Sequence, residues 1–403
     1  MSSILDDLAG RLAELEAAGL RRRLDTDDTS RSDHGLDFVT NDYLSLSRHP
    51  ALGRLLTDRL ALLAEGGGPV GAPASRLLRG DSPLHRRIEA RLARFKGCEA
   101  ALLFPSGYQA NVGLLSALIG AGDRVVSDEA NHASLIDGIR LARCAKVIVP
   151  HLDVGALEET LRTPFPGRTF VVTESLYSMD GDLAPLADYA RLCEQHGAAL
   201  IVDDAHATGL YGERGSGWVE AQGVARRLLA VTSTFGKALG LGGAWVAGSR
   251  VLIDYLTNRC RSFVFSTAVS PLMLLAFETA LDVAEAEPRR RRRVLDAAER
   301  LRLRLRRAGL DCRGRGGPIV PVVLGEVGRA MSVAAALRDE GFDVLAVRPP
   351  TVPEGTARLR LSIHADHTDA DLDRLARRLI ALAEPDASRE QISEVEQVLE
   401  VSV

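Results

Sequence analysis

A lysine amine in an apolar setting is the first candidate for chemistry in this chain. Only three of its fifty basic residues are lysines, and one of them, Lys237, lies in TSTFGKALGLGGA. Arginine stays protonated, whereas burial lowers the proton affinity of lysine and frees its lone pair to form a Schiff base with a carbonyl. The preceding run LLAVTST predicts a buried strand, and ligands of open α/β sheets bind beyond the carboxyl ends of strands. We therefore predict that Lys237 is reactive, and we interpret Lys96 and Lys146 as surface residues.

Three further polar side chains follow predicted strands. Asp203 comes at the end of the buried run in ALIVDDAHATG, His206 follows it, and His132 comes just after the strand DRVVS in ANHASLIDG. A single histidine is more often structural than functional. These residues therefore count as evidence only as a set.

The segment SGYQAN follows the predicted strand AALLFP and opens a helix. A helix N-terminus presents unpaired N–H groups and the positive end of the helix dipole to an anion. The amides of Gly107 and Tyr108, next to Ser106, could therefore hold a phosphate group.

Together these residues match the needs of one cofactor, pyridoxal phosphate. Its aldehyde needs an amine, and its pyridine nitrogen must stay protonated, which the carboxylate of Asp203 would favour. Its ring needs a flat side chain to stack on, and its phenolic oxygen needs a hydrogen-bond donor. Its phosphate needs hydroxyl and backbone amide groups as donors. The residues that could supply these contacts are His132, His206, Ser178, Thr234 and the segment from Ser106 to Tyr108.

Short β-rich runs alternate with helical stretches between about residues 99 and 250 and predict an α/β fold. The runs are AALLF, DRVVS, AKVIVP, TFVVTES, ALIVDD, LLAVTST and AWVAGS. This rhythm is typical of a largely parallel sheet with helices on both faces. Beyond a long helix predicted near 272 to 309, the runs PIVPVVLG, FDVLAVR and ARLRLSIH alternate with helical stretches and predict a smaller α+β unit.

Composition favours a cytoplasmic enzyme with a full hydrophobic core. The chain has 403 residues, of which 46% are hydrophobic and 26% charged, and a formal net charge of −4. Its five cysteines are widely spaced without a CxxC pair, which indicates neither a disulfide framework nor a metal site. No run approaches the roughly 18 apolar residues of a membrane span, and the amphipathic N-terminus is unlike a signal peptide.

An arginine block from Arg289 to Arg293 opens a helical pattern and could indicate nucleic-acid binding. The acidic overall balance and the absence of interleaved aromatic residues argue against that interpretation. We interpret the block as a solvated helix face and expect no nucleic-acid partner.

The motifs resemble those of the α-oxoamine synthases, a family of fold-type I pyridoxal phosphate enzymes. The resemblance runs from about residue 15 to 383 and rests on NDYLSLS, ASRLLRG, FPSGYQAN, NHASLIDG, VTESLYSMDGDLAPL, VDDAHATG, TFGK and RPPTVPEGTARLRLSIHADHT. It implies an aspartate aminotransferase-like fold with a mostly parallel seven-stranded sheet. The expected parts are an N-terminal helix and docking segment (1–45), a large cofactor domain (46–285), a small α+β domain (286–384) and a polar tail (385–403).

The resemblance also implies a role for each residue that matches a family motif. Lys237 would be the Schiff-base lysine and the base, Asp203 would pair with the pyridinium, and His132 would stack on the ring. The other implied cofactor ligands are Ser106, Gly107, Tyr108, Ser178, His206 and Thr234, while Ser266 and Thr267 would reach the phosphate of the partner subunit. The implied substrate ligands are Arg348, which would grip the amino-acid carboxylate, Thr351, Asn41 and Arg21.

The implied reaction is a decarboxylative condensation of an amino acid with an acyl-CoA or acyl carrier protein thioester, in a homodimer with active sites at the subunit interface. Phe235 of TFGK and the RPPTVPEGTARLR stretch favour the branch that joins L-alanine to a pimeloyl thioester in biotin biosynthesis. Two alternatives stay open: a sibling enzyme that uses glycine or serine with another acyl-CoA, and a regulatory protein that keeps the fold without turnover. The SMDGD and RPPTVP contexts make a simple aminotransferase less suitable.

One loop departs from the family pattern. Relatives have a glycine-rich segment where this chain has GGGPVGAPASRLLRG, and Pro69 and Pro73 stiffen it and remove two backbone donors. Because this loop lies near the partner's site in the family, we expect it to affect acyl-chain preference.

Overall fold

The computed structural model describes residues 2–17, 21 and 35–383. Contacts divide the chain into two units, Met1–Gly35 and the chain from Leu36 onward. In the first unit, helix α1 (Ser2–Ala17) exposes the apolar side chains of Ile4, Leu8 and Leu12. The helix expected at the N-terminus is therefore present, and its docking stays a prediction. The proposed tail, 385–403, lies outside the described residues, and the domain boundaries also stay predictions.

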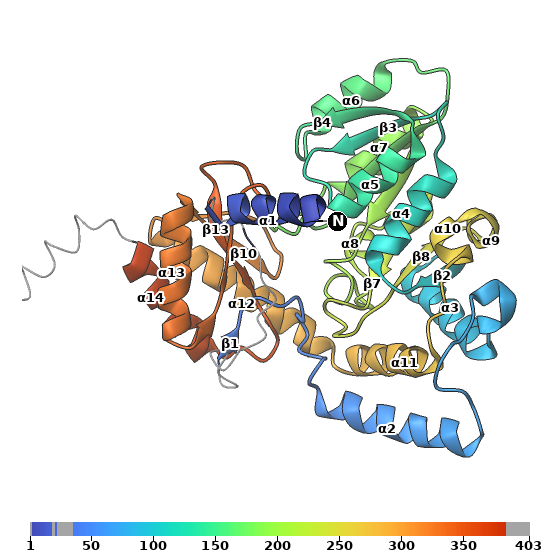
Figure 1. Cartoon of the computed structure of the whole chain (residues 1–403), viewed down its shortest axis with the longest axis horizontal. Helices are drawn as coiled ribbons and strands as arrows, with labels where there is room; N and C mark the ends of the chain where they lie inside the picture. Colours follow the sequence, from blue (N-terminus) through green and yellow to red (C-terminus); the bar gives the residue numbers. More distant parts are fainter. Residues whose placement is uncertain (1, 18–20, 22–34, 384–403) are drawn as a thin grey trace, which may run out of the picture. The chain divides into compact units, whose positions relative to one another are not determined.

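A seven-stranded sheet forms the centre of the second unit (Figure 1). Its strands follow the order β2-β8-β7-β6-β5-β3-β4, and only β8 runs antiparallel to its neighbours. The strands are β2 (Ala100–Phe104), β3 (Arg124–Asp128), β4 (Ala145–Val149), β5 (Thr169–Glu174), β6 (Ala199–Asp203), β7 (Ala230–Thr234) and β8 (Ala244–Gly248). Each strand matches one of the seven apolar runs to within one residue at its end, so the predicted sheet is confirmed.

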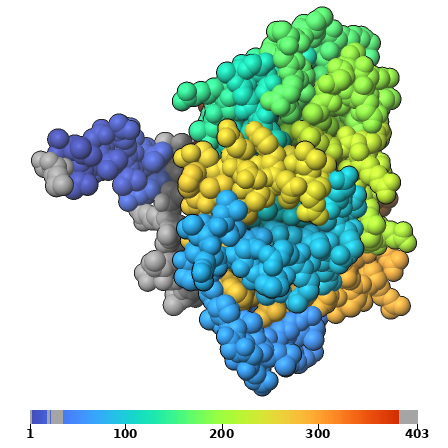
Figure 2. Space-filling model, turned by 90° about the vertical axis from the view of Figure 1, so that its right-hand side faces the viewer, coloured from blue at the N-terminus to red at the C-terminus, as the bar shows by residue number. Residues whose placement is uncertain are grey.

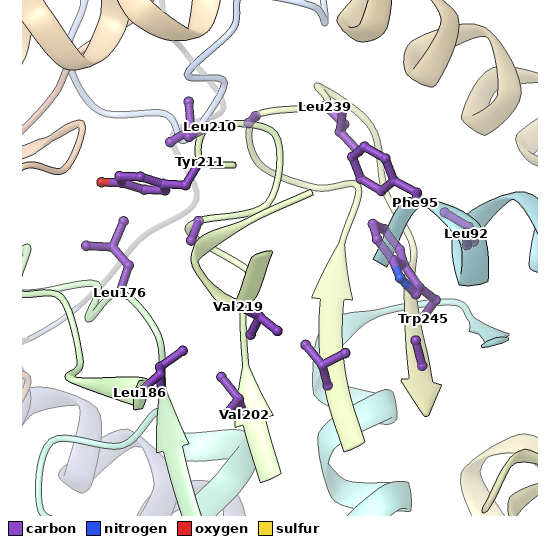
Figure 3. Packing of buried hydrophobic residues seen from close by; sticks show 14 of the residues in the cluster. Leu92, Phe95, Leu176, Leu186, Val202, Leu210, Tyr211, Val219, Leu239 and Trp245 are labelled. Atoms are coloured by element: carbon purple, nitrogen blue, oxygen red, sulfur yellow. The ribbon is translucent and has the colours of Figure 1, made fainter. Parts of the chain in front are cut away.

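Both faces of this sheet are covered, because successive strand residues point to opposite sides. In β2, Leu103 joins one hydrophobic core and Leu102 the other. The first core is shared with α3 (Pro83–Lys96), α6 (Val154–Arg162), α7 (Leu186–Gln195) and α11 (Pro271–Ala286), and the second with α4 (Gly107–Leu118), α5 (Ala133–Ala142), α9 (Arg250–Arg259) and α10 (Arg261–Val264). Figure 3 shows Trp245 of β8 beside Phe95 of α3 in the first core.

A smaller sheet of order β12-β13-β10-β9 lies in the carboxyl-terminal part and has its own core. Its elements are α12 (Pro288–Arg307), β9 (Asp311–Cys312), β10 (Ile319–Gly325), α13 (Val327–Asp339), β12 (Leu345–Val347), β13 (Ala357–Ser362) and α14 (Asp369–Ala383). In β13, Leu359 and Leu361 enter this core, whereas the alternating Arg358 and Arg360 lie on the opposite face. The small sheet thus presents two arginines away from its own core.

Short elements connect these layers. They are β1 (Leu36–Asp37), which pairs with β11 (Phe342–Asp343), helix α2 (Pro50–Glu65), the π-helix η1 (Arg76–Gly80), helix α8 (Trp218–Ala221) and the 3-10 helix η2 (Ala225–Arg227). None of the helices in the described part of the chain has the length and apolarity that a bilayer crossing requires.

The arginine-rich helix α12 is partly neutralised by acids of the last helix. Arg300 pairs with Asp369 at 2.6 Å, and Arg304 pairs with Asp373. Arg290 pairs with Asp366 at 2.8 Å, just before α14. These ion pairs within the fold therefore neutralise part of the positive charge of α12.

The prediction that Lys96 lies on the surface is wrong. Its side chain is 1% exposed and its Nζ lies 2.7 Å from Asp204 Oδ2 and 2.9 Å from Thr208 Oγ1, and it also donates to the carbonyl of Ser216. A sequence window could not reveal this, since Asp204 lies 108 residues away. Lys146 is exposed, as predicted.

We predict that Lys96→Met lowers the free energy of unfolding by about 3–5 kcal/mol, because Asp204 is then buried without a counter-charge. Lys146→Met is the matched control, with an expected change within ~0.5 kcal/mol. Urea unfolding of both variants measures the difference. Equal stability of the two variants would contradict the buried ion pair.

Candidate active site

The site lies at the carboxyl edge of the central sheet. Strands β5, β6 and β7 run parallel, with Glu174 beside Asp203 and Asp203 beside Thr232 in register. The ends of parallel strands therefore bring two carboxylates to one edge. Lys237 follows β7 in the next turn and lies close enough for both carboxylates to affect its pKa.

Lys237 is partly buried at this edge. Burial lowers the pKa of its amine, while the negative charges of Asp203 and Glu174 act in the opposite direction. The net lowering increases the neutral fraction of the amine. That neutral form is the one that attacks a carbonyl or removes a proton.

Asp203 is 8% exposed and its carboxylate is held from two sides. Asn111 Nδ2 donates to Oδ2 at 2.6 Å, and the amide of Ala205 donates to Oδ1 at 2.9 Å. A fixed carboxylate of this kind can stabilise a protonated ring nitrogen.

Glu174 is a second buried carboxylate, which we did not predict from the sequence. Burial, together with the neighbouring charge of Asp203, raises its pKa to about 8. The amide of His132 donates to its Oε1 at 2.6 Å. Glu174 therefore anchors the chain at the turn into α5.

His132 is the N-cap residue of α5, and its ring nitrogen Nδ1 makes a partly buried contact with Ser134. Burial of its surroundings, followed by the positive charge of Lys237, lowers its pKa against the opposing effect of Asp203. The ring is therefore neutral near pH 7 and offers a flat aromatic face.

His206 follows β6 by three residues and is 5% exposed. Its Nδ1 lies 2.8 Å from the hydroxyl of Tyr43, which comes from the segment before α2. Burial lowers the pKa of His206 well below its usual value. A neutral ring held at one nitrogen leaves the other nitrogen available to a ligand.

The start of α4 fits a phosphate group. Ser106 is its N-cap, and the amides that follow at Gly107 and Tyr108 belong to the first turn, which has no intrahelical acceptors. Thr234 Oγ1 is buried and has no hydrogen-bond partner within the described residues. A Cβ at Gly107 would lie 2.7 Å from Thr234 Cγ2, so this close approach requires glycine. The phenol of Tyr108 bonds to Asp137 instead.

Arg360 brings a positive charge from the small sheet into the site, and we did not predict it from the sequence either. Its side chain donates to Asn41 Oδ1 at 2.9 Å and to the carbonyl of Ser178 at 2.5 Å. It is 7% exposed and forms no ion pair with a carboxylate in the described part of the chain. Its charge helps to lower the pKa of Lys237. An anionic ligand would complete its coordination.

Three other predicted substrate residues have local contacts in the described chain. Arg348 donates to Met331 Sδ at 3.8 Å, and Thr351 donates its amide to the carbonyl of Arg348. Arg21 belongs to the first unit and pairs with Glu16 at 3.2 Å.

Ser266 and Thr267 form no hydrogen bond or ion pair with Lys237 or Asp203 in the described chain. Thr267 instead forms an isolated bridge with Ser75, in the proline-bearing loop. Their roles, like those of the other predicted site residues, stay proposals.

The residues that we missed carried weak signals in the sequence. Glu174 ends a strand run, Asn111 closes SGYQAN, and Tyr43 lies in NDYLSLS. Arg360 alternates with leucines in ARLRLS, which is the period of a strand whose second face is polar.

The gathered side chains suit pyridoxal phosphate. An amine, a carboxylate, two neutral imidazoles and a phosphate-sized helix start fit the aldehyde, ring nitrogen, ring face, phenolic oxygen and phosphate of that molecule. No cluster of three or more potential metal ligands occurs among the residues that the structure describes.

Comparison with known proteins gives the family. Residues 33–379 match the model for aminotransferase class I and II. The 8-amino-7-oxononanoate synthase of Anaeromyxobacter dehalogenans (strain 2CP-1 / ATCC BAA-258) is 45% identical over 92% of this chain and 93% of its own length. The enzyme of that name from Geobacter sulfurreducens is 45% identical over 91% of this chain and 95% of its own.

Solved structures agree in fold. Serine palmitoyltransferase of Sphingomonas wittichii superposes with a TM-score of 0.84 at 29% identity, covering 94% of this chain and 97% of that one. An 8-amino-7-oxononanoate synthase from Francisella tularensis superposes with a TM-score of 0.74 at 25% identity, covering 89% and 99%. The expected fold-type I architecture is therefore confirmed, and the chain belongs to the class I and II aminotransferase family, within the group of 8-amino-7-oxononanoate synthases.

Proposed function

We propose that this chain condenses L-alanine with a pimeloyl thioester, with loss of carbon dioxide, to form 8-amino-7-oxononanoate in biotin biosynthesis. The observation that carries the proposal is the amine of Lys237, with lowered pKa, beside Asp203 and Glu174 at one sheet edge. Relatives that are 45% identical over more than nine-tenths of the chain are named for this activity.

Pyridoxal phosphate, when bound through its aldehyde to Lys237, supplies an electron sink for negative charge at the substrate Cα. One solved relative is a high-resolution structure of SPT with PLP, at 29% identity. Asp203 would hold the proton on the ring nitrogen, and His132 would cover the ring. His206 and Ser178 would contact the phenolic oxygen, and Thr234 with the start of α4 would bind the phosphate.

Lys237 would also move the substrate proton. Once the amino acid has taken its place, the freed neutral amine can accept the proton from Cα and later return it to the product. The charge of Arg360 favours this neutral state. The same residue thus serves first as an anchor and then as a base.

Arg360 is our proposed ligand for the substrate carboxylate. Its guanidinium is buried, faces the cluster and pairs with no carboxylate of the described chain. A planar guanidinium can bind a carboxylate through two parallel hydrogen bonds. Arg348, with Thr351, stays a proposed second contact, which would require it to leave Met331. Asn41 would act beside Arg360.

The residues of the site restrict the choice of acyl donor less than the choice of amino acid. The proline-bearing loop, with Pro69 and Pro73, is tied to the strand-like segment before α11 by the amide of Ala268, which donates to Ala74 at 3.0 Å. A rigid loop here could set the acyl length. A sibling activity with glycine or serine and another acyl-CoA is the second candidate, favoured by the close superposition on serine palmitoyltransferase.

We further propose a homodimer in which Ser266 and Thr267 reach the partner's cofactor phosphate. Figure 2 shows α3 and the region of α9 and α10 side by side on one face. Leu77 and Leu78 of η1, with Phe265 just after α10, are 54%, 78% and 73% exposed on the chain alone. A second copy would cover these side chains. The five cysteines, all free, suit a reducing cytoplasm.

We predict that alanine with pimeloyl-CoA is the best pair when CoA release is measured with alanine, glycine or serine against acetyl-, succinyl-, pimeloyl- and palmitoyl-CoA. Products are identified by mass. Lys237→Ala should abolish turnover and the absorbance near ~420 nm of the lysine-bound cofactor. A different preferred pair would support a sibling activity, and normal turnover by Lys237→Ala would contradict the mechanism.

Gly107→Ala should weaken pyridoxal phosphate binding about tenfold or more, because the new Cβ would lie 2.7 Å from Thr234 Cγ2. Gly122→Ala is the control, since a Cβ there meets nothing within 4 Å. Titration of the cofactor-free protein, followed by absorbance, gives both affinities. Unchanged affinity in Gly107→Ala would place the phosphate elsewhere.

Arg360→Ala should raise the KM for alanine about 10- to 100-fold, since a charged hydrogen-bonding partner of the carboxylate is lost. Arg358→Ala is the matched control, because Arg358 comes from the same face of β13 and holds the same loop through Asp180. Steady-state kinetics with saturating acyl donor separate the two effects. If Arg348→Ala raises the KM more than Arg360→Ala, Arg348 is the main carboxylate ligand.

A further inference from the structure

A chain of buried polar contacts links His132 to Asp203 without passing through any ligand. Ser134 Oγ lies 2.8 Å from His132 Nδ1. Asn111 Nδ2 donates to Ser134 Oγ at 2.9 Å and to Asp203 Oδ2 at 2.6 Å. Ser134 and Asn111 are only 1% and 2% exposed, so water does not compete for these bonds.

The direction of each hydrogen bond in this chain follows from the chemistry of its ends. The carboxylate of Asp203 can only accept, so the amide nitrogen of Asn111 must face it. The second hydrogen of the same amide group then points to Ser134 Oγ, which therefore accepts from Asn111. Its own hydroxyl hydrogen remains available to donate to His132 Nδ1.

A second contact fixes the same nitrogen of His132. The backbone amide of Ser134 donates to Nδ1 at 3.2 Å. A backbone N–H is always a donor, so Nδ1 must carry a lone pair. Because the ring is neutral near pH 7, its one proton must be on Nε2.

The main chain of His132 is held at the same time. Its amide donates to Glu174 Oε1 at 2.6 Å, and Glu174 lies beside Asp203 in the register of β5 and β6. The five residues thus form a closed ring of contacts around the sheet edge. This closed set of contacts fixes the orientation of both His132 and Asp203.

We propose that Asn111 and Ser134 are positioning residues that hold His132 as the Nε2–H tautomer and link its orientation to that of Asp203. Through this link, Nε2 is kept as a hydrogen-bond donor toward an anionic or carbonyl oxygen of the bound substrate. The roles of His132 and Asp203 in the reaction rest on the proposed function. The tautomer itself does not.

The test is NMR spectroscopy of the cofactor-loaded protein labelled with ¹⁵N in its histidines. Long-range proton–nitrogen correlations show which ring nitrogen carries the proton, and His132→Asn serves to assign the signal. We expect Nδ1 of His132 to be unprotonated in the wild type. Protonation of Nδ1 in the wild type at neutral pH would overturn the proposal, whatever the enzyme turns over.

The variant Ser134→Ala removes the closer donor to Nδ1, the hydroxyl at 2.8 Å, and leaves only the longer and weaker 3.2 Å contact of the backbone amide. We expect a population with the proton on Nδ1 to appear, together with a roughly tenfold lower kcat, a smaller change in KM and a shifted cofactor absorbance. The lower kcat tests the link to the reaction, and the tautomer signal tests the positioning alone.

Ser127→Ala is the matched control. Ser127 and Asn131 form another buried serine–asparagine bond of 2.9 Å in the same region, which does not touch the ring of His132. The proposal fails if Ser134→Ala and Ser127→Ala behave alike in tautomer, kcat and absorbance. If Ser134→Ala does not fold, the tautomer of His132 in the wild type still tests the proposal.

Discussion

The site depends on keeping a lysine amine partly neutral beside two carboxylates. Full exposure would leave Lys237 protonated, whereas burial without counter-charges would leave the site short of negative charge for a cationic ring nitrogen. The parallel sheet resolves this conflict by placing Glu174 and Asp203 in register at the ends of adjacent strands. Burial raises the pKa of Glu174 to about 8, so the two carboxylates need not both be charged near neutral pH.

The rest of the fold supports this edge from three directions. Lys96 of helix α3 pairs with Asp204, which directly follows Asp203 after β6. Arg360 of the small sheet donates hydrogen bonds to Asn41 and Ser178. Tyr43, in the segment before α2, forms a hydrogen bond with His206. Three distant parts of the sequence thus support a site whose reactive residues end or follow strands of one sheet.

The sequence allowed the strands and the residues at their ends to be predicted, because both are local signals. Seven apolar runs of strand length predicted the sheet; Asp203 lies at the end of one of them, and Lys237 and His132 come after two others. Side chains that reach the site from elsewhere could not be predicted this way. Lys96 and Asp204 are 108 residues apart, and Arg360 and Asn41 are 319 apart, so no local pattern reveals either pair.

The most direct test of the account follows the fate of the alanine carboxylate. The protein is incubated with pimeloyl-CoA and L-alanine labelled with ¹³C in its carboxyl group. We expect labelled carbon dioxide in equal amount to free CoA, and an unlabelled aminoketone of the mass of 8-amino-7-oxononanoate. Release of CoA without labelled carbon dioxide, or a product that keeps the label, would contradict it.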